Sequence, residues 1–245
     1  MTRSEVNKTL HEACYHGDTD GVRLLIEHGA DVNARGISGY TPLIWVCMYG
    51  HLDIARMLIE AGANPNAKDT DRWTPIHWSC CNGHPDIVRL LIEHGADVHA
   101  ATDVKGRIPL HEACANGHTT IARSLLEKDV DVNARDGKGW TSLHEACRCG
   151  HPDIVRLLLD HGAEAVARDK DGRSPLDFAI TLPHYDPARE EIIDLFRHHA
   201  PKTTLEGILA LPREDPLRER TLEWYREHHP DLVMEAWCTM GPEMD

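Results

Sequence analysis

The chain has 245 residues, enough for one or two ordinary domains or for one solenoid of stacked repeats. Its formal net charge of -14 at pH 7 argues against a nucleic-acid or anionic-membrane role that depends on counterion release. No stretch of 18 apolar residues is present, and the polar start MTRSEVNKTL lacks the apolar run of a signal peptide. The eight cysteines are therefore expected to be reduced thiols in an intracellular protein, cytoplasmic or, in a eukaryote, also nuclear.

One sequence register recurs along the chain at a spacing of 33 or 34 residues. An apolar residue marks it each time, at Leu10, Leu43, Ile76, Leu110, Leu143 and Leu176. A constant period of this length is typical of a stacked repeat array. The predicted repeats are residues 3–35, 36–68, 69–101, 102–135, 136–168 and 169–200, followed by an extension at 201–245.

Each repeat begins with a glycine-containing turn, such as DGKGW at 136–140, and continues into an apolar helix. The Thr-Pro pairs at 41–42 and 74–75 supply a capping hydroxyl and a proline at the first helical position. A Gly-His pair closes this helix in repeats two to five, and a second amphipathic helix follows, as in DIVRLLIEHGADV at 86–98. We therefore predict an all-α solenoid of helix pairs joined by hairpin-like loops.

Two repeats depart from this pattern. In repeat four, Asp129 replaces the glycine that stops the second helix, Ile108 replaces the capping threonine, and an extra residue lies within 101–105. We predict that repeat four is the least stable or most bent joint, with Asp129 in the left-handed conformation. Repeat six lacks the Gly-His pair and has a charged second helix, EEIIDLFRHH at 190–199, which is typical of a capping repeat.

These segments resemble the ankyrin repeat family. The matching motifs are GADVNA at 29–34, TPL at 41–43, TPIH at 74–77 and PLHEA at 109–113. The resemblance covers roughly residues 3–200, about five repeats and a terminal one. It implies a non-catalytic module that binds a protein partner through its concave face, which the turn tips and the exposed side of the first helices form.

The segment LHEAC occurs at 10–14, 110–114 and 143–147, and its His, Glu and Cys could suggest a metal site or a thiol nucleophile. The cysteine recurs once per repeat, and helices packed about 8–10 Å apart cannot share a disulfide or a zinc ligand set. We interpret this column as buried small hydrophobes, with the glutamate pointing away from the core. The column is Cys14, Cys47, Cys80, Cys114 and Cys147. The ankyrin resemblance implies that the preceding histidine bonds backbone between repeats.

The chain contains no GxGxxG, Walker-type loop, HExxH or nucleophile elbow. We predict no enzyme activity, no catalytic residue, no cofactor and no bound metal, and a monomer on its own. The remote alternative is a thiol- or zinc-dependent enzyme that uses a His-x-x-Cys pair or the off-column residues Cys81 and Cys149.

Six of the 13 aromatic residues fall on the predicted concave face of repeats one to three, and such rings dominate binding hot spots. The alternative is that they pack on the next repeat. Repeats four and five carry charged residues there, so we predict an apolar anchor followed by a polar section that sets orientation. The predicted partner-binding residues are Tyr15, Tyr40, Trp45, Met48, Tyr49, Trp73, Trp78, Asn82, Arg107, Glu112, Trp140, Glu145 and Arg148.

The family resemblance also implies hydroxylation by an asparaginyl hydroxylase, in a eukaryote, of the asparagine in each VNA-type turn. The matching positions are Asn33, Asn66 and Asn133, with His99 in that place in repeat three. The alternative is that each asparagine only stabilises its turn by bonding local backbone.

Residues 201–245 leave the repeat pattern and carry a net charge of -5. A capping box at Thr203 and Glu206 and the prolines Pro216 and Pro230 predict three helices. Two interpretations stay open. The segment is either a helical cap on the last repeat, or a second docking element that makes the protein an adaptor or effector recruiting, for example, ubiquitin-ligase machinery.

Overall fold

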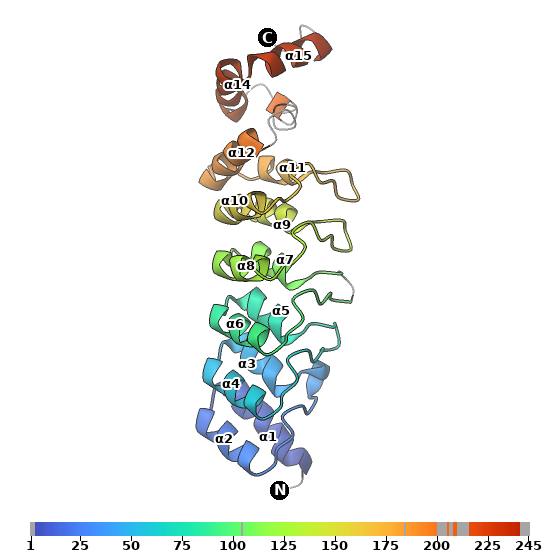
Figure 1. Ribbon diagram of the computed structural model, residues 1–245, viewed down its shortest axis with the longest axis vertical. Coiled ribbons are helices and arrows are strands. Elements are labelled where there is room, and N and C mark those ends of the chain that lie inside the picture. Colours follow the sequence, from blue (N-terminus) through green and yellow to red (C-terminus); the bar gives the residue numbers. More distant parts are fainter. Residues whose placement is uncertain are drawn as a thin grey trace. The chain divides into compact units, whose positions relative to one another are not determined.

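The computed structural model describes residues 3–103, 105–183, 185–199, 205, 208–209 and 216–240. Within these ranges the regular elements are helices and no strand occurs, which confirms the predicted all-α class. The chain forms two compact units, unit 1 (Met1–Lys138) and unit 2 (Gly139–Asp245) (Figure 1). Their boundary falls in the turn that begins the fifth predicted repeat. The predicted domain boundary at residue 200 stays a prediction.

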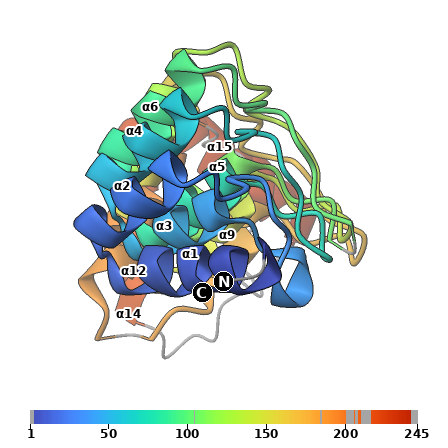
Figure 2. The same cartoon turned by 90° about the horizontal axis from the view of Figure 1, so that it is seen from below.

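Unit 1 consists of four helix pairs. Its elements are α1 (Arg3–His16), α2 (Thr19–Glu27), the short 3-10 turn η1 (Ile37–Gly39), α3 (Pro42–Tyr49), α4 (Leu52–Glu60), α5 (Pro75–Asn82), α6 (Pro85–Glu93), α7 (Pro109–Ala115) and α8 (Thr119–Leu126). The odd-numbered inner helices pack on one another in order, and so do the even-numbered outer helices. Figure 2 shows these two layers side by side, with the connecting loops together on one side of the inner layer.

The core of unit 1 follows the predicted columns. Leu10, Leu43, Ile76 and Leu110 are fully buried, as are the column cysteines of all four repeats. Burial raises the pKa of Cys14 and of Cys47 to about 12, so these thiols stay protonated at neutral pH. The cysteines are therefore packing residues, as predicted.

The helix ends also follow the sequence. Thr41 caps α3, its Oγ1 accepting a hydrogen bond of 3.3 Å from the N–H of Ile44. Gly50 ends the same helix with φ +84°, in the left-handed region. Asp129, which stands where other repeats have a stop glycine, has φ +54° and confirms the predicted left-handed conformation.

Two columns of histidine join neighbouring repeats. His77 Nδ1 accepts from the N–H of Thr74 at 3.3 Å, and its Nε2 donates to the carbonyl of Arg107 in the next repeat at 3.1 Å. Burial lowers the pKa of His77 to about 4, so the ring is neutral. The bridging role implied by the family resemblance is confirmed.

The second histidine column was not predicted. The histidines of the Gly-His pairs contact backbone carbonyls of the preceding repeat, at 3.4 Å for His51 and Tyr15 and 3.3 Å for His84 and Met48. The imidazole of His84 lies directly over Gly50, where an added Cβ would come within 2.6 Å of Cε1. The Gly-His pair is therefore a packing motif between repeats.

Unit 2 contains α9 (Ser142–Arg148), α10 (Pro152–Asp160), α11 (Pro175–Ile180), α12 (Pro187–His199), α14 (Pro216–His228) and α15 (Pro230–Met240). Helix α9 packs on α10 and α11, and α12 packs on α10 and α11. Thr141 caps α9 although Ser142 stands where four other repeats have proline, and His144 Nδ1 accepts from the Thr141 N–H at 3.1 Å.

Within unit 2, α14 is attached to α12. Arg197 is buried, pairs with Asp194 and donates to Thr221 Oγ1 at 2.5 Å, and its guanidinium lies 5.5 Å from the Trp224 ring centre. A small apolar cluster supports this contact, made of Leu205, Leu209, Leu222 and Tyr225. The predicted capping box at Thr203 and Glu206 lies outside the described residues.

Candidate functional site

The six aromatic residues predicted to form an anchor make one connected cluster in unit 1, here called the aromatic face. It consists of Tyr15, Tyr40, Trp45, Tyr49, Trp73 and Trp78. The Trp45 ring centre lies 5.4 Å from that of Tyr15 and 4.9 Å from that of Tyr40, both edge to face. Tyr40 continues to Trp78 at 5.8 Å. These edge-to-face contacts hold the rings in place and so limit the side-chain conformational entropy that the rings would lose on binding a partner.

The rings pack between repeats, as the structural interpretation expects, and their role in binding stays a prediction. The contacts from Tyr15 to Trp45 and from Tyr40 to Trp78 join neighbouring repeats, so the rings do support the stack. Yet Tyr15 is 43% exposed and Tyr49 44% exposed, and the other four rings are half-buried. The aromatic face therefore keeps apolar surface open to solvent on inner helices and turn tips.

Asp69 fixes the end of this face in repeat three. Its Oδ2 accepts a hydrogen bond of 3.1 Å from Trp78 Nε1, and its Oδ1 accepts from the N–H groups of Asp71 and Trp73, both at 2.9 Å. Burial raises the pKa of the Tyr40 hydroxyl, and the negative charges of Asp69 and Asp71 raise it further. Tyr40 is therefore a neutral hydrogen-bonding group at physiological pH.

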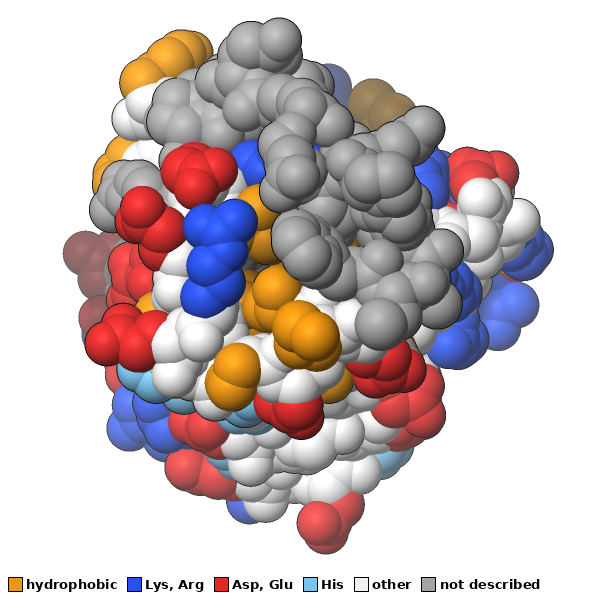
Figure 3. Space-filling view, turned by 90° about the horizontal axis from the view of Figure 1, so that it is seen from above, with side chains coloured by type: hydrophobic (Ala, Val, Ile, Leu, Met, Phe, Trp, Pro, Cys, Tyr) orange, Lys and Arg blue, Asp and Glu red, His pale blue; other side chains and the backbone are white. Residues whose placement is uncertain are grey.

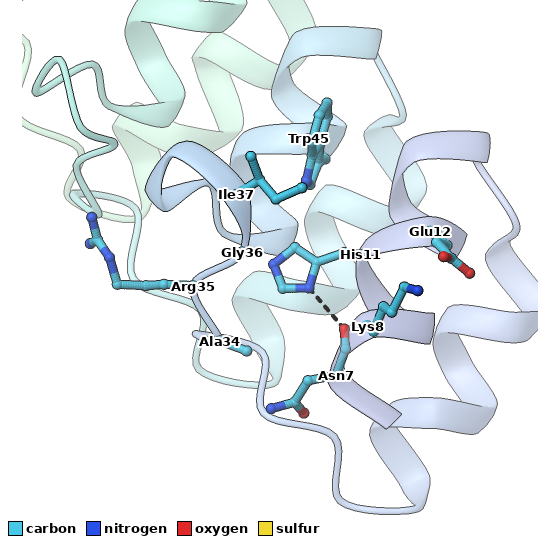
Figure 4. A pocket seen from close by; sticks show the side chains of 9 residues that line it. All are labelled: Asn7, Lys8, His11, Glu12, Ala34, Arg35, Gly36, Ile37 and Trp45. Carbon is cyan, nitrogen blue, oxygen red and sulfur yellow. Dashed lines mark hydrogen bonds between the residues drawn. The ribbon is translucent and has the colours of Figure 1, made fainter. Parts of the chain in front are cut away.

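A pocket of about 380 Å³ lies beside Trp45. Its lining residues are Asn7, Lys8, His11 and Glu12 from α1, Ala34, Arg35, Gly36 and Ile37 from the connection between α2 and α3, and Trp45 from α3. Figure 4 shows Ile37 and Trp45 together at one side, and Lys8 and Glu12 at another. His11 is held in place because its Nδ1 lies 2.8 Å from the carbonyl oxygen of Asn7. The pocket therefore lies between Trp45 of the aromatic face and the loop that connects α2 to α3.

The prediction that the LHEAC glutamate points away from the core is wrong for two of its three positions. Glu12 is exposed, but Glu112 and Glu145 are only 5% and 2% exposed. Glu112 forms a two-pronged ion pair with Arg107, at 2.6 Å to Nε and 3.4 Å to Nη2. This pairing replaces water around the carboxylate, which is why the glutamate can be buried.

The predicted contact residues of unit 2 are also mostly internal. Trp140 is 8% exposed and donates from Nε1 to Asp169 Oδ2 at 2.9 Å, and Glu145 binds Arg148 at 2.8 Å. Arg148 remains exposed. The predicted polar section is therefore reduced in unit 2 to Arg148, because the tryptophan and the glutamate are satisfied inside the fold.

Two predicted residues border the aromatic face. Met48 is half-buried on α3, and Asn82 is exposed at the end of α5, where its Nδ2 donates to the carbonyl of Trp78 at 2.9 Å. Both are placed to extend a contact surface along the inner helices.

Sequence comparison agrees with this architecture. A family model for three copies of the ankyrin repeat matches residues 2–69 and again 64–136, and a model for many copies matches residues 125–179. The chain belongs to the ankyrin repeat family. No curated protein matches it significantly. The family matches end at residue 179, and the assignment of a terminal ankyrin repeat beyond that point depends on the packing of α12 against α10 and α11.

In this ankyrin repeat chain, the asparagines predicted as hydroxylation sites bridge neighbouring repeats. Asn33 Nδ2 donates to the carbonyl of Gly62 at 3.0 Å, and its Oδ1 accepts from the N–H of Asn64 at 2.8 Å. Asn66 makes the same two bonds to the following repeat, at 2.9 and 2.7 Å. These side chains bond the backbone of the next repeat, whereas within the turn the side chains of Asp31 and Asn64 accept from the N–H groups of Asn33 and Asn66. Asn133 occupies the same position in repeat four.

The off-column cysteines Cys81 and Cys149 are both half-buried. Burial, followed by the charge of Glu112, raises the pKa of Cys81, which disfavours the nucleophilic thiolate. Over the part of the chain that the structure describes, no three His, Cys, Asp or Glu side chains form a group able to hold a metal ion. In the same part, no helix is both long and apolar enough to cross a membrane.

Proposed function

We propose that this chain is a non-catalytic module that binds a protein partner on the aromatic face of unit 1. The observation that carries the proposal is the connected cluster of six rings in which Tyr15 and Tyr49 stay 43% and 44% exposed. Tyrosine and tryptophan dominate binding hot spots, and exposed apolar patches on soluble proteins mark interaction sites. The ankyrin family uses this side of the repeat stack for recognition, which supports the same choice.

The proposed set of binding residues is smaller than the set predicted from the sequence. The anchor is the aromatic face, with Met48 and Asn82 beside it. Glu112, Trp140 and Glu145 serve the fold. Arg107 is nearly buried against Glu112, so its contribution is to hold that carboxylate in place.

For residues 201–245 we propose a structural role. The contacts of Arg197 with Thr221 and Trp224 attach α14 to the terminal repeat and support the interpretation as a cap. An adaptor role for this segment stays a prediction. Hydroxylation of Asn33, Asn66 and Asn133 also stays a prediction, and mass spectrometry of the protein from its native cell tests it.

Affinity capture from the native cell tests the main proposal. Full-length wild type is compared with Trp45→Ala/Trp78→Ala and with Tyr15→Ser/Tyr49→Ser, whose rings are the more exposed pair. The matched control is Tyr185→Ala, which removes a ring that is 89% exposed and lies outside unit 1. All variants must first show wild-type helical content and melting temperature.

We expect a protein that wild type and the control capture and both double variants lose. The second double variant keeps the test informative if the first fails to fold. Equal capture by a folded Tyr15→Ser/Tyr49→Ser variant would place the partner elsewhere and contradict the proposal.

A further inference from the structure

Two indole N–H groups of this chain donate to a buried aspartate. Trp78 Nε1 lies 3.1 Å from Asp69 Oδ2, and Trp140 Nε1 lies 2.9 Å from Asp169 Oδ2. The two aspartates are 5% and 7% exposed. The fold therefore uses a carboxylate as the partner of the indole nitrogen in two separate repeats.

Repeat two lacks this carboxylate. Gly36 precedes Trp45 by nine residues, as Asp69 precedes Trp78. The backbone is equivalent, since the N–H of Gly36 donates across its turn at 2.8 Å and that of Asp69 at 2.9 Å. Without a side chain at Gly36, Trp45 Nε1 makes no hydrogen bond within the described ranges, and the 380 Å³ pocket opens at this point.

The charges around the pocket favour an anion. Lys8 is exposed on its rim and forms no ion pair within the described residues of unit 1, 3–103 and 105–138. Arg35 donates one N–H to the carbonyl of Lys68 at 2.7 Å and keeps further donors. Glu12 is the acidic lining residue, and Figure 4 shows it next to Lys8 rather than beside Trp45. Figure 4 shows the Arg35 guanidinium directed away from Trp45, so an entering carboxylate would meet the indole donor, with Lys8 and Arg35 on separate sides of the pocket.

A basic edge continues from the pocket along the loops of unit 1. Backbone hydrogen bonds join the loops edge to edge, from Thr70 to Ser38 at 3.0 Å and from Asp103 to Asp71 at 3.1 Å. The edge carries six basic residues, Arg35, Lys68, Arg72, Lys105, Arg135 and Lys138.

The acidic residues of this edge largely do not oppose that charge. Asp69 and Asp136 are buried and accept backbone N–H bonds, and Asp103 Oδ1 lies 3.6 Å from Arg72 Nη1. Asp71 is exposed and is the acidic residue of this edge that opposes the basic side chains. The edge is thus basic on balance in a chain of net charge -14. Figure 3 shows one face of the molecule from above, with Lys and Arg side chains along part of one border and Asp and Glu side chains beside them.

We infer that the partner docks through an acidic segment, one of whose aspartate or glutamate side chains enters the pocket and accepts a hydrogen bond from Trp45 Nε1, as Asp69 does for Trp78. The remaining carboxylates of the segment lie along the basic edge. The inference rests on the proposed function and names the chemistry of its partner. A carboxylate is favoured over a nucleic-acid phosphate, because Trp78 and Trp140 of this fold both donate their indole N–H to a carboxylate.

Selection from displayed random peptides tests the inference with the full-length chain. The peptides are fused through their C-termini, so that no free terminal carboxylate competes. We expect enrichment of Asp and Glu, and binding of the selected peptides about tenfold weaker to Trp45→Phe, which keeps a ring but removes the N–H donor. Trp224→Phe, the same change in unit 2 and outside the aromatic face, is the matched control and leaves binding within about twofold.

Two further test variants, each with a control variant, examine the acceptor site beside Trp45 and the charges of the basic edge. Gly36→Asp supplies an internal carboxylate and should block the pocket, whereas Gly36→Ala, which controls for volume, should weaken binding less. Lys68→Glu/Lys105→Glu should weaken binding about five- to tenfold at low salt, and Arg56→Glu/Lys128→Glu, an equal charge change on exposed outer positions, should change it little.

The outcomes separate this inference from the proposed function. Peptides without acidic enrichment that still lose binding to Trp45→Ala would overturn the acidic segment and leave the aromatic face as the docking site. Failure to select any peptide whose binding depends on the aromatic face would count against both. Acidic peptides unaffected by Trp45→Phe would overturn the pocket, and binding of single-stranded DNA that Lys68→Glu/Lys105→Glu abolishes would assign the edge to nucleic acid instead.

Discussion

Repeats two and three differ from repeats four and six at the same two positions, five residues apart. One position precedes the cap of the inner helix and the other lies in its first turn. In repeats two and three the pair is aromatic, with ring centres 4.9 Å apart for Tyr40 and Trp45 and 4.7 Å for Trp73 and Trp78. In repeat four it is the ion pair of Arg107 and Glu112, and in repeat six the Arg173 guanidinium lies 4.8 Å from the Phe178 ring centre.

The difference shows that the repeat backbone brings the side chains at these two positions into contact, whereas the residue types decide whether the contact is aromatic or ionic. An ion pair shields its own members, as the near burial of Arg107 and Glu112 shows. Two aromatic rings in contact leave apolar surface exposed and do not pair each other's polar groups. The indole N–H of Trp45, which has no hydrogen-bond acceptor within the described residues, is an example. The proposed recognition surface therefore lies where the aromatic pairs are, in repeats two and three, with Tyr15 of repeat one beside them.

The largest effect is expected from breaking the ion pair of repeat four. Arg107→Ala leaves the buried Glu112 carboxylate without its cation and should lower the free energy of unfolding by about 3 kcal/mol. Urea unfolding followed by circular dichroism measures this loss. The double variant Arg107→Trp/Glu112→Trp installs the repeat-three pair and should recover much of it. No recovery would mean that the two positions are not interchangeable.

The second prediction compares the two units at one glycine. Gly50→Ala in unit 1 should cost about 2–3 kcal/mol, because the left-handed φ of +84° is strained for alanine and its Cβ would lie 2.6 Å from His84. Gly150→Ala in unit 2 meets Ala188 at 3.4 Å instead and should cost about 1 kcal/mol. Thermal unfolding of both variants gives the difference, and equal losses would show that the histidine moves aside freely.

The third prediction exchanges His77 for the isoleucine that repeat two carries at Ile44. His77→Ile loses the hydrogen bond to the Arg107 carbonyl, about 1 kcal/mol at neutral pH. The native histidine has its pKa lowered from 6.5 to about 4, so wild type should lose stability as pH falls from about 6.5 towards 4, since the unfolded chain binds the proton more tightly.

Unfolding free energies across this pH range test the sign. The variant should show a shallower decline than wild type, with the curves converging or crossing on the acid side. A decline in the variant as steep as that of wild type would assign the pH dependence to other groups.

Much of the fold could be predicted because a fixed period places equivalent residues in columns. The cysteine column, the left-handed Asp129 and the bridging role of His77 all follow from that register. Burial of Glu112 could not be deduced in the same way, because it depends on which residue stands five positions earlier. The pocket was missed for a related reason, since it arises from a side chain that Gly36 does not have. Aligning Gly36 with Asp69 and Asp169 is the signal that could have revealed it.

The smallest effect is expected from restoring that side chain. Gly36→Asp places a carboxylate where repeat three has Asp69, so Trp45 Nε1 gains an acceptor worth about 1 kcal/mol. The gain is reduced by crowding, since a Cβ at this position lies 3.1 Å from the His11 ring. At φ -92° the backbone itself is not strained.

We therefore expect Gly36→Asp to have a free energy of unfolding higher than that of Gly36→Ala by at most about 0.5 kcal/mol, measured by urea unfolding. Trp45→Phe in the Gly36→Asp background should remove the difference, because the donor is gone. If Gly36→Asp is less stable than Gly36→Ala and Trp45→Phe leaves that difference unchanged, Trp45 Nε1 does not reach a carboxylate at this position. The equivalence between repeats two and three would then hold for the backbone alone, and the open pocket would follow from the 3-10 turn η1 rather than from the missing aspartate.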